Sequence, residues 1–290
     1  MTGGNTLLIA QATDIHIGFE PDNPDEHNML RFRAVVDHML TGPNRPDMLL
    51  LTGDLTENGD DASFARLAEA VAPCPFPVWP MVGNHDDREA LIRAFPQTPQ
   101  HDGFIQYALD AGEVRLLLLD TLEPKRHGGA FCETRAAWLA DQLAADTSRP
   151  TVIVMHHPPF PCGIPWMDTD PREPWVARFA EAISGAGNLS AIVCGHLHRP
   201  ISSRFGGIPA MVCPSTAPTV ALDFRPISPD IPDGRCLISD EPAGYALHSW
   251  SQGELLTHYE TVGMGSLRCL AEYSPNLQPM VHSMLDERPR

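Results

Sequence analysis

The sequence has few cationic residues and no apolar run long enough to cross a membrane. It carries 20 Lys and Arg against 37 Asp and Glu among 290 residues, so its formal net charge at pH 7 is −17. A surface this negative repels a polyanion, and no Lys/Arg cluster reverses the sign locally. We therefore expect neither a nucleic-acid polymer nor a membrane as a partner.

Cysteine is also used sparsely. The seven cysteines are scattered and show no CxxC spacing, which does not fit a disulfide framework and is typical of a reducing compartment. The amino terminus has no Lys or Arg ahead of its first apolar stretch, residues 7–12, which reads as a strand and not as a secretory signal. Both features predict a cytoplasmic protein.

Short apolar runs alternate with amphipathic stretches along the chain. Runs such as residues 48–51 and 116–119 are continuously apolar, which suits strands covered on both faces. The expected strands are residues 7–13, 48–52, 78–82, 105–109, 114–120, 151–155, 191–194, 201–205, 209–213, 245–250 and 254–259. The expected helices are residues 28–40, 62–71, 88–95, 135–145 and 175–183. This alternation predicts an α/β fold with helices outside central sheet, and after residue 201 we expect strands without helices.

The chain length suits one domain, which we place at residues 1–262. Residues 263–290 show little periodicity and are expected to be a tail or an oligomer contact. Two stretches rich in proline, residues 158–174 and 225–242, are long enough to be functional loops or lids. In the first, Trp166, Met167 and Asp168 are expected either to line a pocket or to pack on the surface.

Five short polar motifs directly follow expected strands. They are Asp14-Ile15-His16, Gly53-Asp54, Gly83-Asn84-His85-Asp86, His156-His157 and Gly195-His196-Leu197-His198. Ligands gather at the carboxyl ends of strands in α/β sheets, so these motifs are expected to meet in one place. Carboxylate, amide oxygen and imidazole are ligands that hard and borderline metals accept without cysteine. Each motif alone is weak, but the ordered set predicts a metal site.

The order D-x-H, G-D, G-N-H-[DE], H and G-H-x-H resembles that of the calcineurin-like metallophosphoesterase superfamily, over about residues 7–259. Residues 214–216, 220–223 and 241–245 are similar to one bacterial branch. That branch contains class III cyclic nucleotide phosphodiesterases and glycerophosphodiester phosphodiesterases. The resemblance implies a four-layer αββα sandwich and the hydrolysis of small phosphodiesters.

The resemblance also implies two metal ions per chain, of iron, manganese or zinc, with Asp54 shared between them. One ion would be held by Asp14, His16, Asp54 and His198, and the other by Asp54, Asn84, His156 and His196. Two such ions bind phosphoryl oxygens and activate a water, so that a metal-bound hydroxide attacks phosphorus.

Three further residues of the motifs have expected roles. His85 is not needed as a ligand and is expected to stabilise the transition state or protonate the leaving oxygen. Its alternative is a structural role in supporting Asn84 or Asp54. Asp86 is expected either to orient His85 or to cap the following helix. His157 is expected to be structural, because adjacent strand residues point in opposite directions.

The identity of the substrate depends on residues outside the ligand set. Relatives in the branch often carry histidine in a T-x-H segment, where this chain has Pro218. The basic candidates near the motifs are Arg88 and Arg199, which form no evident clamp. We expect diesters to be preferred over monoesters, with loose discrimination among diesters.

Two other functions and one further property remain open at this stage. A phosphomonoesterase or pyrophosphatase would use the same metals, and a non-catalytic scaffold is disfavoured by the complete ligand set. We also expect a homo-oligomer with two-fold symmetry. Residues 263–285 bear Met and Leu without an obvious place in a four-layer core, and relatives of the branch often assemble.

Overall fold

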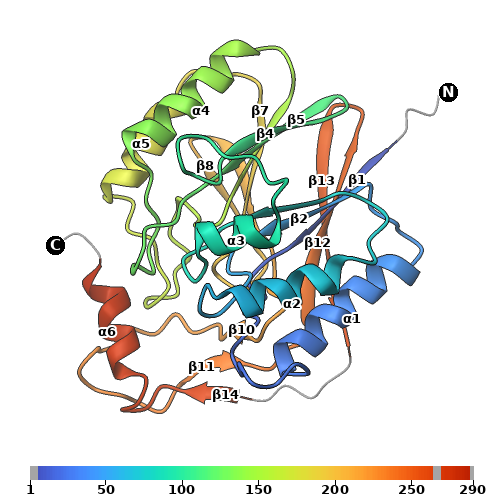
Figure 1. Ribbon diagram of the computed structural model, residues 1–290. Coiled ribbons are helices and arrows are strands. Elements are labelled where there is room, and N and C mark those ends of the chain that lie inside the picture. The colour runs from blue at the N-terminus through green and yellow to red at the C-terminus, as the bar shows by residue number, and fades with distance from the viewer. Residues whose placement is uncertain (1–5, 264–268, 288–290) are drawn as a thin grey trace.

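The computed structural model describes residues 6–263 and 269–287 and contains two large sheets packed between layers of helices (Figure 1). One sheet has the strand order β13-β12-β1-β2-β3 and the other the order β4-β5-β6-β7-β9-β8. Helices α1, α2 and α3 lie outside the first sheet, while α4 and α5 lie outside the second. The predicted four-layer α/β architecture is confirmed.

Each of the two large sheets contains neighbouring parallel strands and has antiparallel strands at one or both edges. The five-stranded sheet comprises β1 (Leu7–Ala12), β2 (Met48–Thr52), β3 (Val78–Met81), β12 (Ala243–Ser251) and β13 (Glu254–Val262). Its first three strands are parallel, and β12 and β13 are antiparallel additions. The six-stranded sheet comprises β4 (Tyr107–Ala111), β5 (Val114–Leu119), β6 (Thr151–Met155), β7 (Leu189–Cys194), β8 (Ile201–Phe205) and β9 (Ile208–Val212).

Six helices and a small third sheet complete the described part of the chain. The helices are α1 (His27–Thr41), α2 (Asp61–Val71), α3 (Arg88–Ala94), α4 (Glu133–Ala145), α5 (Pro174–Ala182) and α6 (Gln278–Asp286). The third sheet contains β10 (Thr219–Val220), β11 (Cys236–Ser239) and β14 (Cys269–Glu272). Within residues 6–263 and 269–287, no helix has the length and apolar content needed to cross a membrane.

The leucine run of β5 shows why the strands read as continuously apolar. Leu116 and Leu118 pack in the cluster that also contains the first sheet and its helices. Leu117 and Leu119 pack in the cluster formed with α4 and α5. Both faces of β5 are therefore covered, and every position from 114 to 119 is buried.

Two expectations about secondary structure are wrong. The first expected strand of the second sheet begins at Tyr107 and not at residue 105, because the backbone N–H of Ile105 donates to the carboxylate of Asp120 instead of to a ladder. Helices do not stop after residue 201, since α6 forms near the carboxyl end. Its apolar residues have helical spacing and pack against the second cluster, namely Leu277, Met280, Val281, Met284 and Leu285.

Candidate metal centre

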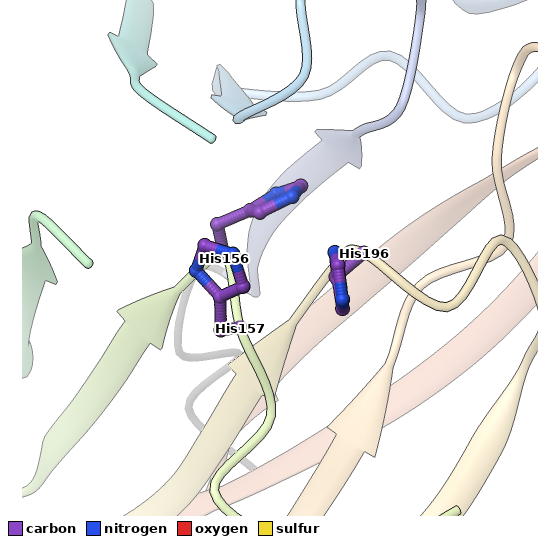
Figure 2. A group of neighbouring side chains, drawn as sticks. All are labelled: His156, His157 and His196. Carbon is purple, nitrogen blue, oxygen red and sulfur yellow. The ribbon is translucent and has the colours of Figure 1, made fainter. Parts of the chain in front are cut away.

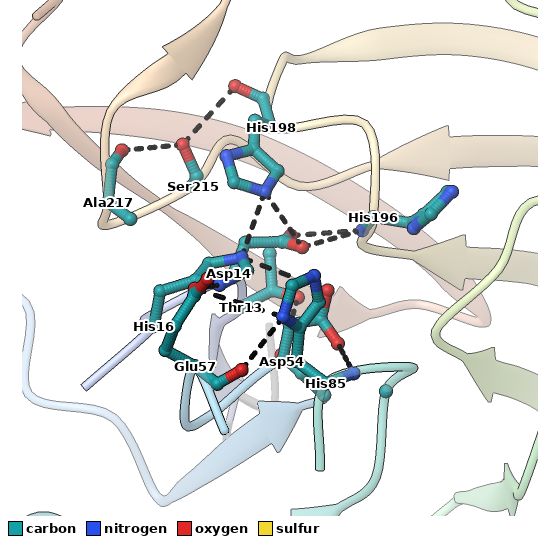
Figure 3. Close-up of polar contacts among 12 residues, drawn as sticks. Thr13, Asp14, His16, Asp54, Glu57, His85, His196, His198, Ser215 and Ala217 are labelled. Atoms are coloured by element: carbon teal, nitrogen blue, oxygen red, sulfur yellow. Dashed lines mark hydrogen bonds and ion pairs between the residues drawn. The ribbon is translucent and has the colours of Figure 1, made fainter. Parts of the chain in front are cut away.

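The carboxyl ends of five strands bring the predicted residues together (Figure 3). Those of the first sheet follow β1, β2 and β3, and those of the second follow β6 and β7. Figure 3 labels residues that follow β1, β2, β3 and β7. Five of the seven candidate ligands have φ angles between 49° and 70°, which residues other than glycine seldom adopt: Asp14, His16, Asp54, His196 and His198. Backbone strain of this kind concentrates at functional sites, where the surrounding structure enforces it.

Gly83 allows the loop after β3 to lie close to two candidate ligands. A Cβ atom at Gly83 would lie 2.3 Å from Oδ1 of Asp54 and 2.7 Å from Nε2 of His156. No side chain fits in that space, so the loop after β3 can lie against two candidate ligands only with glycine at this position.

Asp14, His16 and His198 form one cluster of candidate ligands, whose ligand atoms lie within 4.8 Å of one another. The two Nε2 atoms of His16 and His198 are 3.2 Å apart, and Nε2 of His198 is 3.4 Å from Oδ1 of Asp14. Imidazole nitrogens and a carboxylate oxygen thus converge on one point, as a borderline metal requires.

Asp54 lies between this cluster and a second one formed by Asp14, Asp54 and His156. Its Oδ2 atom is 3.2 Å from Nε2 of His156 and 3.8 Å from Nε2 of His16. The carboxylate is buried, and its Oδ1 accepts a hydrogen bond from the backbone N–H of His85 at 2.9 Å. Asp14 therefore belongs to both clusters, and Asp54 reaches from the second cluster toward His16 of the first.

Unpaired buried atoms test whether these residues fit a metal ion. Oδ1 of Asn84 and Nε2 of His156 are both buried and have no hydrogen-bond partner. Such atoms are rare in folded proteins because their desolvation is not compensated. A bound cation would satisfy both lone pairs, so the donor set fits a metal.

Three candidate histidines are held through their Nδ1 atoms. Nδ1 lies 2.7 Å from the Glu57 carboxylate in His16, 2.9 Å from the Thr52 carbonyl oxygen in His156 and 2.8 Å from the Pro218 carbonyl oxygen in His198. Because these partners accept hydrogen bonds, each Nδ1 carries a proton and each Nε2 is available. Metal-binding histidines are commonly oriented in this way.

His196 is placed differently from the other candidates. Its ring lies near His156 and His157, with centroid distances of 5.3 and 4.7 Å (Figure 2). Nδ1 of His157 is 2.7 Å from the Thr121 hydroxyl, and Nε2 of His157 is 3.1 Å from the carbonyl oxygen of His127. Both nitrogens of His157 are therefore engaged, which agrees with a structural role.

Burial and the charges of neighbouring groups have opposing effects on the pKa values of these residues. Burial raises the pKa of Asp14 to about 6. Burial opposes ionisation of Asp54 as well, but the charge of His156 holds the pKa of Asp54 well below its usual range. Burial would likewise lower the pKa of His156, yet the adjacent Asp54 raises it to about 9. The Asp54 carboxylate and the His156 imidazole thus stabilise each other's charged form, and a bound cation would take the place of the proton on Nε2 of His156.

The two expected roles of Asp86 are both wrong. Its carboxylate accepts hydrogen bonds from the backbone N–H groups of Gly83, Leu55 and Thr56, and so ties the loops after β2 and β3 together. Asp87 caps α3 instead, by accepting from the N–H of Ala90 at 2.9 Å. The neighbour that contacts His85 is Glu57, three residues after Asp54. Its backbone carbonyl oxygen makes this contact, so side-chain type gave no signal for it, whereas the acidic side chain near the Gly-Asp turn could have indicated its contact with His16.

The two basic candidates near the motifs are engaged by acidic partners. Nε and Nη2 of Arg88 each lie 2.7 Å from the carboxylate of Asp120. Arg199 donates to the carbonyl oxygen of Val220 at 2.8 Å and to Glu241 at 3.0 Å. Their charges are compensated within the protein.

Most of the chain matches a family of known proteins. The family model of the calcineurin-like phosphoesterases matches residues 7–200. The chain belongs to this family. This calcineurin-like phosphoesterase is therefore an enzyme of a hydrolase family, and the recognition made from its motifs is confirmed.

Two bacterial relatives and one solved structure show how far the similarity of this phosphoesterase extends. It is 34% identical over 223 residues to the "Probable cyclic nucleotide phosphodiesterase" of Rhodopseudomonas palustris, covering 73% of this chain and 77% of the relative. It is 26% identical over 264 residues to the "Probable glycerophosphodiester phosphodiesterase GpdQ" of Arcobacter nitrofigilis, covering 89% and 94%. A dimetal phosphatase from Danio rerio superposes with a TM-score of 0.58 at 14% identity, covering 87% and 98%, which shows a common fold.

Proposed function

We propose that the protein hydrolyses small phosphodiesters of the cyclic nucleotide or glycerophosphodiester type at a two-metal site. The observation that carries this proposal is the position of Asp54, whose Oδ2 reaches toward both His16 and His156. The proposed ligands of one ion are Asp14, His16, Asp54 and His198. Those of the other are Asp54, Asn84, His156 and His196. Iron, manganese and zinc all accept this set of oxygen and imidazole donors.

Residues of the chain supply orientation and a proton. Two ions held by these ligands would supply Lewis-acid chemistry, which polarises phosphoryl oxygens and lowers the pKa of a water. His85 holds its Nδ1 against the Glu57 carbonyl oxygen at 2.9 Å, so its Nε2 is the atom that can protonate the leaving oxygen. The charge of Asp54 raises the pKa of His85 against the opposing effect of burial, which favours the protonated form.

The charges around the site support a diester substrate. A diester carries one negative charge, whereas a monoester carries two near neutral pH and needs more cations around it. Arg88 and Arg199 are already paired with Asp120 and Glu241. The formal net charge of −17 also opposes multiply charged substrates.

A substrate panel with metal-loaded protein tests the proposal. The panel contains 3′,5′-cyclic nucleotides, glycerophosphodiesters, p-nitrophenyl phosphate and pyrophosphate. We expect kcat/KM to be higher for diesters than for monoesters and pyrophosphate, and to be lost in Asp54→Ala. Efficient cleavage of monoesters or pyrophosphate with negligible diester cleavage would replace this function with a phosphomonoesterase or pyrophosphatase.

We further propose that the enzyme acts in the cytoplasm. The cysteine side chains that the structure describes are all free thiols, at positions 74, 132, 162, 194, 213 and 236. Free thiols persist in a reducing compartment, where no disulfide is needed for stability. Fractionation of cells that express the tagged chain checks this location.

A further inference from the structure

The carboxyl-terminal helix α6 brings an acidic residue to the neighbourhood of the metal centre. The side chain of Val281 is fully buried, and Met284 packs against the same cluster as α4 and α5. Glu287 follows directly after α6 and lies against the loop that contains His127. Helix α6 thus packs on its own chain and holds Glu287 next to the loop that contains His127.

Both carboxylate oxygens of Glu287 accept hydrogen bonds from this loop. Oε1 accepts from the backbone N–H of His127 at 3.0 Å, and Oε2 accepts from the N–H of Gly128 at 2.8 Å. Arg126 adds an ion pair of 3.7 Å to Oε2 and donates to the backbone carbonyl oxygen of Glu287 at 3.3 Å. One ionised side chain therefore fixes two consecutive peptide groups, with bonds stronger than those between neutral groups.

The same loop contacts the residues around the metal centre. The carbonyl oxygen of His127 accepts from Nε2 of His157 at 3.1 Å, and the ring of His127 lies 6.0 Å from that of His85, centroid to centroid. A cavity of about 30 Å³ at this boundary is lined by His127, His157, His196, Met284 and Glu287, among others. Residues of α6 and Glu287 therefore share this pocket with residues around the candidate metal centre.

We propose that Glu287 is a positioning residue, which holds His127 beside His85 on the side where the alcohol leaves. The inference rests on the proposed function, because His85 defines that side only if it protonates the leaving oxygen. Two adjacent glycines, Gly128 and Gly129, follow His127 and give the loop more conformational freedom once the carboxylate is removed. His127 then leaves the place that it occupies next to His85.

Backbone amide exchange tests the contact without any assay of activity. Glu287→Ala should accelerate exchange at residues 127 and 128 by about tenfold or more, because each amide loses a charge-assisted hydrogen bond. Glu287→Gln keeps one oxygen acceptor and should restore part of the protection. The matched control is Asp286→Ala, which removes an exposed carboxylate from the preceding position. Exchange at 127 and 128 that is the same in Glu287→Ala and in the control would overturn the proposal.

Kinetics then separate positioning from simple stabilisation. In Glu287→Ala we expect kcat/KM to fall about tenfold for diesters with alkyl leaving groups and much less for bis(p-nitrophenyl) phosphate, whose leaving group needs little protonation. Metal content should match that of Asp286→Ala. Equal losses on both substrates, or loss of metal, would overturn the positioning role. A wild-type enzyme inactive on every diester would instead refute the proposed function, while faster exchange at 127 and 128 would still report the contact.

Discussion

Nδ1 of His85 lies 2.9 Å from the backbone carbonyl oxygen of Glu57. A carbonyl oxygen can only accept, so Nδ1 carries the proton and Nε2 is the nitrogen that exchanges one with a ligand. The carboxylate of the same Glu57 lies 2.7 Å from Nδ1 of His16. One residue therefore orients both the candidate acid, through its backbone, and a candidate metal ligand, through its side chain.

Glu57→Gln should weaken metal binding without displacing His85. The backbone carbonyl oxygen remains, while the charged acceptor for His16 is lost. Removing such a supporting partner typically lowers metal affinity or activity by about 10- to 100-fold. Metal titration of the variant measures this change, and Glu69→Gln, on the exposed face of α2, is the control. Equal metal affinity in the two variants would mean that Glu57 does not support a ligand.

His85→Ala should slow turnover while leaving the metal content nearly unchanged. General acid catalysis contributes about 10²- to 10⁴-fold, so we expect kcat to fall within that range. The loss should be larger for alkyl than for p-nitrophenyl leaving groups, since the former need a proton. Steady-state kinetics on both substrates, with metal analysis of the same samples, measures this. An equal loss on both, or loss of metal, would assign His85 a structural role.

Pro218→His should sharpen the preference for one diester. The carbonyl oxygen of residue 218 accepts from Nδ1 of His198 at 2.8 Å, and any residue supplies that oxygen. Metal content should therefore stay the same, whereas the new imidazole adds a polar contact that raises discrimination among alcohols. The ratio of kcat/KM values across the diester panel is the measurement. A ratio equal to that of wild type would show that position 218 does not contact substrate.

Much of the fold follows from local patterns in the chain. Continuous apolar runs such as residues 151–155 match their strands without error, because strands buried on both faces have a composition of their own. Helix α6 was missed although Met280, Val281 and Met284 have helical spacing, since the segment is only nine residues long and has no side-chain cap at its start. Its stability comes from packing on a distant cluster, which no local pattern contains.

The candidate site could be predicted only in part for a related reason. Residues that belong to the motifs themselves, such as Asp14 and His198, lie close together as expected. The partners that orient them come from elsewhere: Pro218 acts through a backbone oxygen that every residue has, and Glu287 reaches the loop at residue 127 across 160 positions of sequence. The contact of Pro218 with His198 leaves no signal in side-chain type. The contact of Glu287 with the loop at residue 127 depends on tertiary packing.

We expect the enzyme to form a homo-oligomer with two-fold symmetry, the commonest closed arrangement. The segment from residue 263 to 285 stays one expected contact, although apolar residues of α6 pack on their own chain. Strand β13 is an edge of the five-stranded sheet, and its Leu256 is 54% exposed. An open edge with an apolar side chain offers such a surface. Light scattering at micromolar concentration should report a multiple of the chain mass of 31.8 kDa. A monomer would contradict the prediction.

Elemental analysis of active wild-type protein and of Asp54→Ala tests the two-metal site most directly. Asp54 is the only proposed ligand shared by both ions, so its removal should lower metal content and diesterase activity together. We predict two metal ions per chain in the wild type and a loss of both metal and activity in the variant. One metal ion or none in fully active wild-type protein would contradict the two-metal site.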